Sequence, residues 1–298
     1  MSTKLKKLAD QVLVITGASS GIGLATARSA AEQGGKVGLA ARSDKALKDV
    51  VAAINASGGD AIGVVCDVSE RAQVNKLASD AVAKYGRIDT WVNTAGLGMY
   101  GRLDETDEGD AKRLFEVNFW GVVNVTRAAL PVMRGQRSGH ILQISSVGGR
   151  LGMPGLSAYQ AAKWAVGGFT EVVAQEVAPL GIKICAVEPG GMRTNWAVRA
   201  GQGTPTIIDD YLPSVGAIRE LLGTYAGNEP SDPDRIAQIL LKLAYHEQLP
   251  LHLLIGNDAL QYCGQAETAR AEAGERWLEV SRAADYSAPV ELPAFPSH

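Results

Sequence analysis

Short apolar runs rich in β-branched residues recur along the chain and alternate with stretches of helical character. Seven of these runs are expected to form strands: Val12–Ile15, Val37–Ala41, Ala61–Val68, Thr90–Asn93, His140–Ser145, Ile182–Glu188 and Leu251–Ile255. Six helices are expected between them: Gly21–Gln33, Asp44–Ala56, Glu70–Tyr85, Asp110–Met133, Ser157–Ala178 and Pro233–His246. Because continuous apolar runs are typical of strands covered on both faces, the alternation predicts an α/β fold, with a parallel sheet between two layers of helices.

Two segments interrupt this alternation. Thr194–Asn228 is rich in Gly, Pro and Thr and follows the sixth expected strand, at the edge where open α/β sheets bind ligands. We interpret it as a mobile lid over the substrate, with an ordinary exposed loop as the alternative. Asp258–Ala284 is expected to form an extra C-terminal helix, followed by an irregular tail over 287–298. The length of 298 residues allows a single large domain, 1–298.

Composition excludes several classes of function. Lys and Arg number 29 against 32 Asp and Glu, so the net charge of −3 offers no bulk attraction to nucleic acid or to acidic membranes. No apolar run approaches the length of a membrane span, and the histidines lack metal-ligand spacing, so neither a membrane nor a metal partner is expected. Three widely spaced cysteines argue against a disulfide framework and favour the cytoplasm.

The first expected strand leads directly into a glycine-rich turn, which ends where the first helix begins. Gly17, Gly21 and Gly23 permit a tight turn and let backbone N–H groups approach a diphosphate, and the helix adds a favourable dipole. A simple strand-to-helix turn is the alternative, since 34 glycines make chance matches easy. The succession of strand, turn and helix favours a dinucleotide site.

Tyr159 and Lys163 lie four residues apart, on one face of an expected helix. A phenol beside a fixed ammonium can exchange protons near neutral pH if positive charge lowers its pKa. Ser146 lies upstream of both, after the fifth expected strand. Each also has an ordinary interpretation: a packing tyrosine, a solvated lysine and a serine in a turn. Together with the glycine turn, they predict a nicotinamide-dependent oxidoreductase.

These motifs, in this order, resemble those of the short-chain dehydrogenase/reductase family over roughly residues 10 to 256. The matching segments are Thr16–Gly23 for Thr-Gly-x-x-x-Gly-x-Gly, Asn93–Gly96 for Asn-Asn-Ala-Gly, Tyr159–Lys163 for Tyr-x-x-x-Lys, and Pro189–Thr194 for Pro-Gly-x-x-x-Thr. The resemblance implies a Rossmann-like, doubly wound fold with a seven-stranded parallel sheet. The chain departs from the family at Thr94, where a second Asn is usual, and at Ala162, where Ser is common.

The resemblance also implies the functional residues. The implied catalytic set is Asn118, Ser146, Tyr159 and Lys163. The implied cofactor-binding residues are Gly17, Ser19, Ser20, Gly21, Ile22, Gly23, Arg42, Asp67, Val68, Asn93, Ala95, Gly96, Tyr159, Lys163, Pro189, Gly190 and Thr194. Asp67 is expected to meet the adenine amino group, with capping of the next helix as its competing role.

In the implied reaction, Tyr159 donates a proton to a carbonyl oxygen or accepts one from an alcohol. Work as a base near pH 7 requires its pKa to fall by about three units, or about 4 kcal/mol of phenolate stabilisation. Lys163 and the oxidised nicotinamide are the positive charges expected to provide it. Ser146 is expected to bind the substrate oxygen, and Asn118 to hold a water that links Lys163 to solvent.

Cofactor choice depends on the end of the second strand. An acidic residue there would bind the 2′-hydroxyl of NAD and repel a 2′-phosphate. Ala41 occupies that position, and Arg42 and Ser43 follow it. The planar fork of Arg42 suits a phosphate, so NADP(H) is predicted, with NAD(H) as the alternative cofactor. The ordinary interpretation of Arg42 is a surface residue in a loop.

The substrate is predicted only as a class, a small apolar ketone, aldehyde or steroid-like molecule. The expected pocket residues are mostly apolar: Leu97, Met99, Tyr100, Val147, Met153, Met192 and Trp196. The stretch Ser145–Tyr159 resembles a branch that holds 17β-hydroxysteroid dehydrogenases and bacterial oxidoreductases of unassigned substrate. Three alternatives stay open: an NAD-dependent alcohol dehydrogenase, an NADP(H) sensor without turnover, and an epimerase or dehydratase. A homodimer or homotetramer packed through Asp110–Met133 and Ser157–Ala178 is expected.

Overall fold

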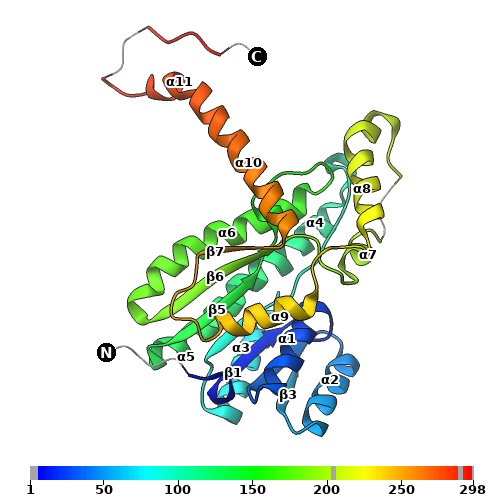
Figure 1. The fold of residues 1–298 in the computed structure, drawn as a ribbon, viewed down its shortest axis with the longest axis vertical. Helices are drawn as coiled ribbons and strands as arrows, with labels where there is room; N and C mark the ends of the chain where they lie inside the picture. The colour runs from blue at the N-terminus through cyan, green and yellow to red at the C-terminus, as the bar shows by residue number, and fades with distance from the viewer. Residues whose placement is uncertain (1–5, 203–205, 288–290, 297–298) are drawn as a thin grey trace.

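The computed structural model describes residues 6–202, 206–287 and 291–296. Its centre is a seven-stranded parallel sheet with the order β3-β2-β1-β4-β5-β6-β7 (Figure 1). The strands are β1 Val12–Thr16, β2 Lys36–Ala41, β3 Asp60–Val65, β4 Thr90–Asn93, β5 Gly139–Ile144, β6 Ile182–Pro189 and β7 His252–Ile255. The predicted Rossmann-like fold is confirmed. Since β1 pairs with both β2 and β4, the strand order reverses at β1, which is where open sheets of this kind bind ligands.

Helices cover both faces of the sheet (Figure 1). They are α1 Gly21–Glu32, α2 Asp44–Ala56, α3 Arg71–Tyr85, α4 Glu108–Phe115, α5 Gly121–Gln136, α6 Ser157–Val177, α7 Trp196–Ala200, α8 Ala217–Tyr225, α9 Pro233–Leu243, α10 Asn257–Arg276 and α11 Leu278–Arg282. None of the helices in the described ranges is long and apolar enough to cross a membrane.

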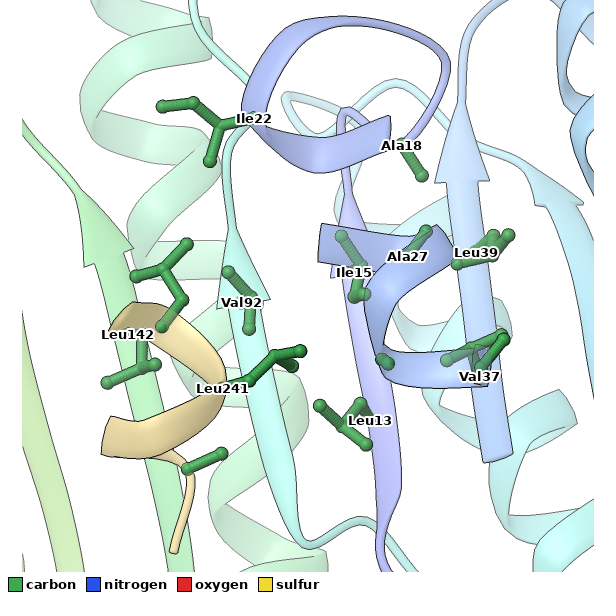
Figure 2. Packing of buried hydrophobic residues seen from close by; sticks show 14 of the residues in the cluster. Leu13, Ile15, Ala18, Ile22, Ala27, Val37, Leu39, Val92, Leu142 and Leu241 are labelled. Atoms are coloured by element: carbon green, nitrogen blue, oxygen red, sulfur yellow. The ribbon is translucent and has the colours of Figure 1, made fainter. Parts of the chain in front are cut away.

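Successive residues of β1 point into two different cores, which explains why its sequence is apolar without alternation. Leu13 and Ile15 pack with residues of α1, α2 and α9, and Figure 2 shows Leu241 of α9 in this layer. Val14, between them, packs with residues of α3, α5 and α6 on the opposite face. The sheet is therefore held rigidly from both sides, and its carboxyl edge is a firm base for a site.

The predicted helix Asp110–Met133 is wrong in one respect, because it is not continuous. A π-helical turn, Glu116–Trp120, separates α4 from α5. Inside that turn, the Asn118 amide accepts a hydrogen bond from the backbone N of Leu97 at 2.7 Å and donates to its carbonyl at 2.8 Å. The wider turn directs this side chain at a neighbouring loop, a feature that helical periodicity does not reveal.

Two smaller predictions at the third strand are also wrong. The strand was expected to reach Val68, but it ends at Val65, because the Asp67 side chain turns the chain by accepting from Ser69 N at 3.0 Å. Ser69 and Glu70 directly precede α3 and are expected from the sequence to cap it, but neither side chain caps this helix. The Ser69 hydroxyl instead donates to Asp67 at 2.7 Å, so it is not available to the helix.

Of the two segments that interrupt the alternation, the first is more helical than expected and the second is divided into two helices. Thr194–Asn228 contains α7 and α8, although 203–205 lie outside the described residues. The predicted C-terminal helix ends early, at Arg276, and α11 follows it. α10 leads away from the sheet, carrying α11 at its far end (Figure 1). The expected tail falls partly outside the described residues, at 288–290 and 297–298, and its residues 291–296 form neither helix nor strand.

Candidate active site

A large cleft opens at the carboxyl edge of the sheet and has a volume of about 510 Å³. One side consists of the glycine turn after β1 and the loops after β2, β3 and β4. Ser146, Tyr159 and Lys163 line its floor, and residues of α7, α8 and the start of α10 line the other side. The cleft thus brings together most of the implied cofactor and catalytic residues.

The backbone of the glycine turn packs closely against the residues behind it, and this close packing leaves room in the cleft for a large ligand. Gly17 and Gly21 have φ of 70° and 54°, a region that favours glycine. A Cβ on Gly23 would collide with the carbonyl of Gly17 and lie 2.5 Å from Thr94 Oγ1. Ser20 precedes α1 without capping it through its side chain. The first N–H groups of α1 are therefore suited to receive a phosphate, and the turn fits a dinucleotide.

Asn93 and Thr94 hold this wall in place from behind. The Asn93 side chain accepts from Thr16 Oγ1 at 2.5 Å and donates to Gln143 at 3.1 Å, so it lies buried within the sheet rather than at the cleft. The Thr94 hydroxyl donates to the Thr16 carbonyl at 2.6 Å. Thr94, which stands where the family usually has Asn, thus links the end of β4 to the end of β1 beneath Gly23.

Asp67 is fixed by a partner that the sequence did not suggest. Arg113 of α4 pairs with the Asp67 carboxylate and donates to Ser69 Oγ at 2.6 Å. Burial raises the pKa of Asp67, but the hydrogen bonds from Ser69 and the Arg113 guanidinium outweigh it and lower that pKa. Asp67 lines the cleft as an anchored carboxylate, able to accept from an adenine amino group. The competing role as a cap of the next helix is not observed.

The end of β2 carries no carboxylate. Ala41 is buried, and Arg42 is exposed at the rim of the cleft. Across the described ranges, no Asp or Glu lies within ion-pair distance of Arg42. The Ser43 hydroxyl accepts from Ala46 N at 3.3 Å and caps α2. The guanidinium of Arg42 is therefore available for an anionic ligand.

Tyr159, Ser146 and Lys163 lie close together on the floor. Tyr159 stands in the first turn of α6 and hydrogen-bonds to Ser146, whose Oγ accepts from Gly148 N at 3.0 Å. Lys163 follows one turn later; its Nζ lies 5.9 Å from the Tyr159 ring centroid and donates to the Ile144 carbonyl at 2.9 Å. β5 therefore positions both the serine and the lysine, since Ile144 is its last residue.

Burial has opposite effects on the two titrating groups. It raises the pKa of Tyr159 to about 12, with partial relief from the Ser146 hydrogen bond. It lowers the pKa of Lys163 to about 8. Burial thus favours the protonated phenol, which suits proton donation to a carbonyl. The fall in pKa that a tyrosine base needs, with Lys163 and the oxidised nicotinamide as its source, stays a prediction.

Asn118 lies behind the floor rather than on it. Its side chain fixes the backbone at Leu97, and a Cβ on Gly96 would lie 3.3 Å from Asn118 Oδ1 and 3.8 Å from Lys163 Nζ. Asn118 thus sets the loop that borders the lysine. A water held by Asn118 stays a prediction.

Aromatic residues dominate the substrate side. Trp196 of α7 lies 5.1 Å from Tyr159 and 6.0 Å from Tyr100, between ring centroids. A Cβ on Gly98 would collide with its indole. Of the expected pocket residues, Met99 does not line the cleft and packs behind it, whereas the others do: Leu97, Tyr100, Val147, Met153, Met192 and Trp196.

Several lining residues were missed because they come from distant segments: Leu221, Leu222, Tyr225, Glu229, Asp258 and Tyr262. Asp258, at the start of α10, accepts from Gly191 N at 2.7 Å and from the Tyr225 hydroxyl at 3.2 Å. A Cβ on Gly190 would collide with this carboxylate. Asp258 thereby connects the turn after β6, the helix α8 and the C-terminal helix. Its only sequence signal was a carboxylate just after the last strand.

Arg150 and Arg193, which are close in sequence to the expected pocket residues, are engaged elsewhere. Arg150 lies 3.3 Å from Glu188 and also pairs with Glu267 of α10. Arg193 donates to the Glu229 carbonyl at 3.2 Å. Neither lines the cleft.

Comparison with known proteins is consistent with this geometry. The sequence model of short chain dehydrogenases matches residues 11–204. The chain belongs to the short-chain dehydrogenase family. It is therefore an oxidoreductase, and this family uses NAD or NADP.

Individual relatives align over almost the whole chain. Oxidoreductase BOA17 of Botryotinia fuckeliana is 44% identical over 274 residues, which cover 92% of this chain and 98% of that protein. A short-chain dehydrogenase from Streptomyces avermitilis superimposes with a TM-score of 0.81 at 38% identity, covering 93% of this chain and 99% of that one. A short-chain dehydrogenase/reductase from Burkholderia phymatum, solved in complex with NAD, superimposes with a TM-score of 0.75 at 28% identity. The match covers 97% of this chain and 99% of that one.

Proposed function

We propose that this short-chain dehydrogenase interconverts a carbonyl compound and a secondary alcohol with NADP(H), and that reduction is its favoured direction. The observation that carries the proposal is the arrangement on the floor, where Ser146 hydrogen-bonds to a buried Tyr159 and Lys163 lies one turn further along α6. A sensor that turns nothing over would not need a buried proton donor beside a lysine.

The protein's own groups then have distinct tasks. Tyr159 gives its proton to the carbonyl oxygen, and Ser146 hydrogen-bonds to the same oxygen as charge develops on it. Lys163 is directed by the Ile144 carbonyl, so its ammonium stays near the phenol and stabilises the phenolate left behind. The bound cofactor supplies the hydride. The side of the cleft formed by α7, α8 and the start of α10 limits the access of water to this proton transfer.

The cofactor-binding residues that the family resemblance implies fall into three groups, according to the part of the cofactor that each would contact. Ser19, Ser20, Gly21 and Ile22 line the phosphate region. Asp67 and Val68 line the adenine region, and Ala95, Gly96, Pro189, Gly190 and Thr194 line the stretch towards the floor. Gly17 also lines the cleft, whereas Gly23 and Asn93 act from behind by shaping the wall.

Preference for NADP(H) over NAD(H) rests on Arg42 at the rim and on the absence of a carboxylate from the end of β2. A 2′-phosphate would receive the guanidinium fork, whereas a 2′-hydroxyl would lack its usual acidic partner. The NAD-bound relative from Burkholderia phymatum favours the alternative, an NAD-dependent alcohol dehydrogenase. Steady-state kinetics with each cofactor decide between them: a higher kcat/KM with NADH would contradict the preference.

The substrate side favours an apolar or aromatic ketone or aldehyde, because Tyr100, Met153 and Trp196 border the floor. A screen of ketones, aldehydes and alcohols, followed at 340 nm, tests the function. NADPH oxidation with at least one ketone is expected, and loss of that activity in Tyr159→Phe. If purified protein binds NADPH but oxidises it with no carbonyl compound, the sensor alternative replaces this proposal.

We also propose that the protein forms a homodimer or homotetramer in the cytoplasm. Trp120, Trp164 and Val172 on the outer side of the π-turn and α6 are 50%, 44% and 57% exposed. Burial of such side chains against a second copy would stabilise an assembly. The cysteines, which are free and buried, suit a reducing compartment. Light scattering should give the mass of two or four chains; a monomer would contradict the assembly.

A further inference from the structure

The substrate side of the cleft contains two carboxylates without a cationic partner. Glu229 is 5% exposed and lines the cleft, and Asp258 lines it beside Tyr225. Within the described parts of the chain, neither forms an ion pair with a lysine, arginine or histidine. A buried carboxylate usually has a counter-charge, since removal of its hydration is costly.

Each carboxylate is only partly satisfied by hydrogen bonds. Glu229 Oε2 accepts from Gly227 N at 2.9 Å. Asp258 Oδ2 accepts from Gly191 N and from Tyr225, whereas the buried Oδ1 has no partner among the described residues. These N–H and O–H donors orient the carboxylates but do not neutralise them.

Four aromatic rings line the same region, from Tyr100 and Trp196 beside the floor to Tyr225 and Tyr262 beside Asp258. Burial is the main cause that raises the pKa of Tyr100 and of Tyr225 to about 12; Asp258 adds to the rise at Tyr225, and the charge of Glu229 makes a smaller contribution at both rings. Aromatic faces attract ammonium groups, and a nearby carboxylate strengthens that attraction.

The positive groups that line the cleft form no ion pair with Glu229 or Asp258 in the described ranges. Arg42 is at the end of β2, Lys163 is on the floor, and Arg199 is exposed on α7. Arg193 meets Glu229 through its backbone carbonyl rather than its carboxylate. The region between Tyr100 and Asp258 is therefore acidic and aromatic.

We infer that this region binds a positively charged ammonium group on the substrate, so that the enzyme prefers carbonyl compounds or alcohols that carry a cationic nitrogen. The inference rests on the proposed function, in that the rest of the same molecule reaches Tyr159. Glu229 and Asp258 supply the opposite charge, and the tyrosines and Trp196 supply the faces around it.

Matched ligands test the inference without dependence on turnover. The probes are phenyl ketones that carry a trimethylammonium group two to five carbons from the carbonyl, each paired with the tert-butyl analogue that replaces nitrogen by carbon. The two members of a pair have nearly the same shape and differ in charge. Calorimetric titration into the protein saturated with NADP⁺ measures their binding.

We expect the charged ketone to bind about tenfold more tightly than its neutral analogue at the best chain length, as cation–aromatic attraction with a carboxylate allows. Glu229→Gln keeps an oxygen to accept from Gly227 N and removes the charge. It should abolish most of that preference and leave the affinity of the neutral ketone within about twofold. Glu220→Gln, at an exposed position on α8, is the matched control. It should change neither the preference for the charged ketone nor the affinity of the neutral one.

Equal or weaker binding of the charged ketones at every chain length would overturn the inference, and this comparison needs only the wild-type protein. An equal loss for both members of a pair in Glu229→Gln would overturn the role of that carboxylate. The proposed function fails by a different result, namely no NADPH oxidation with any ketone, charged or neutral. Turnover of neutral ketones with no preference for charge would refute the inference alone.

Discussion

The two sides of the cleft are built in different ways. The cofactor side comes from short loops that directly follow strands, and the ends of the strands support it from behind, as where the Thr94 hydroxyl donates to the Thr16 carbonyl. The substrate side comes from α7, α8 and the start of α10, where Asp258 joins α10 to Tyr225 of α8 and to the turn after β6. The contrast indicates that chemistry and cofactor binding are fixed by the sheet, whereas substrate choice is set by segments that can vary independently.

Loss of the phenol should give the largest effect. Tyr159→Phe keeps the ring against Trp196 but removes the proton donor that Ser146 holds. We expect kcat to fall by about a thousandfold, within the range for removal of a general acid, while NADPH affinity is unchanged. Tyr100→Phe, which alters another hydroxyl of the same cleft, is the control and should lose far less. Similar losses in both variants would contradict the assignment.

A methyl group at the glycine turn should have the next largest effect. Gly23→Ala places a Cβ against the Gly17 carbonyl and Thr94, so about 1–3 kcal/mol of stability should be lost together with NADPH affinity. Thermal melts with and without NADPH measure both quantities. Gly168→Ala on α6, where a Cβ meets nothing within 4 Å, should keep or slightly raise stability. If NADPH raises the melting temperature of Gly23→Ala as much as that of the wild type, the close packing is not required for NADPH binding.

The pH dependence should reflect Lys163 rather than Tyr159. Burial lowers the pKa of Lys163 to about 8 and raises that of Tyr159 to about 12. Below about pH 8 both groups are protonated, so kcat/KM for ketone reduction should be level; above it, the lysine loses its charge and the rate should decline by up to about tenfold per unit. The measurement is a series of initial rates from about pH 6 to about pH 10. A rate that rises through pH 8 would contradict this order of pKa values.

The smallest effect is expected on the substrate side. Tyr225→Phe removes the 3.2 Å hydrogen bond to Asp258 and loosens α8. The KM for a ketone should rise roughly threefold to tenfold, as loss of one hydrogen bond allows, with NADPH affinity unchanged. Tyr245→Phe, at an exposed tyrosine that does not line the cleft, should alter neither value. A drop in NADPH affinity instead would show that the two sides are not independent.

The same contrast explains what the sequence revealed. The strands and the glycine turn were predictable because their signals are local: apolar runs for strands, and glycines where the backbone packs closely, as at Gly23. The ion pair of Arg113 with Asp67 was not predictable, because charge alone does not say which distant residues meet. Asp258 and Glu229 were missed for the same reason. The effect of burial on the pKa of Tyr159 was also not predictable, because it depends on how the chain packs around the ring, Trp196 of α7 included.

The central claim is that the hydroxyls of Tyr159 and Ser146 act together on one substrate oxygen, on a floor fixed by β5 and α6. A crystal structure with NADP⁺ and the best ketone from the screen tests it most directly. Both hydroxyl oxygens should lie within about 3.2 Å of the ketone oxygen, with the carbonyl carbon facing the nicotinamide. A Tyr159 hydroxyl directed away from the nicotinamide would contradict the account.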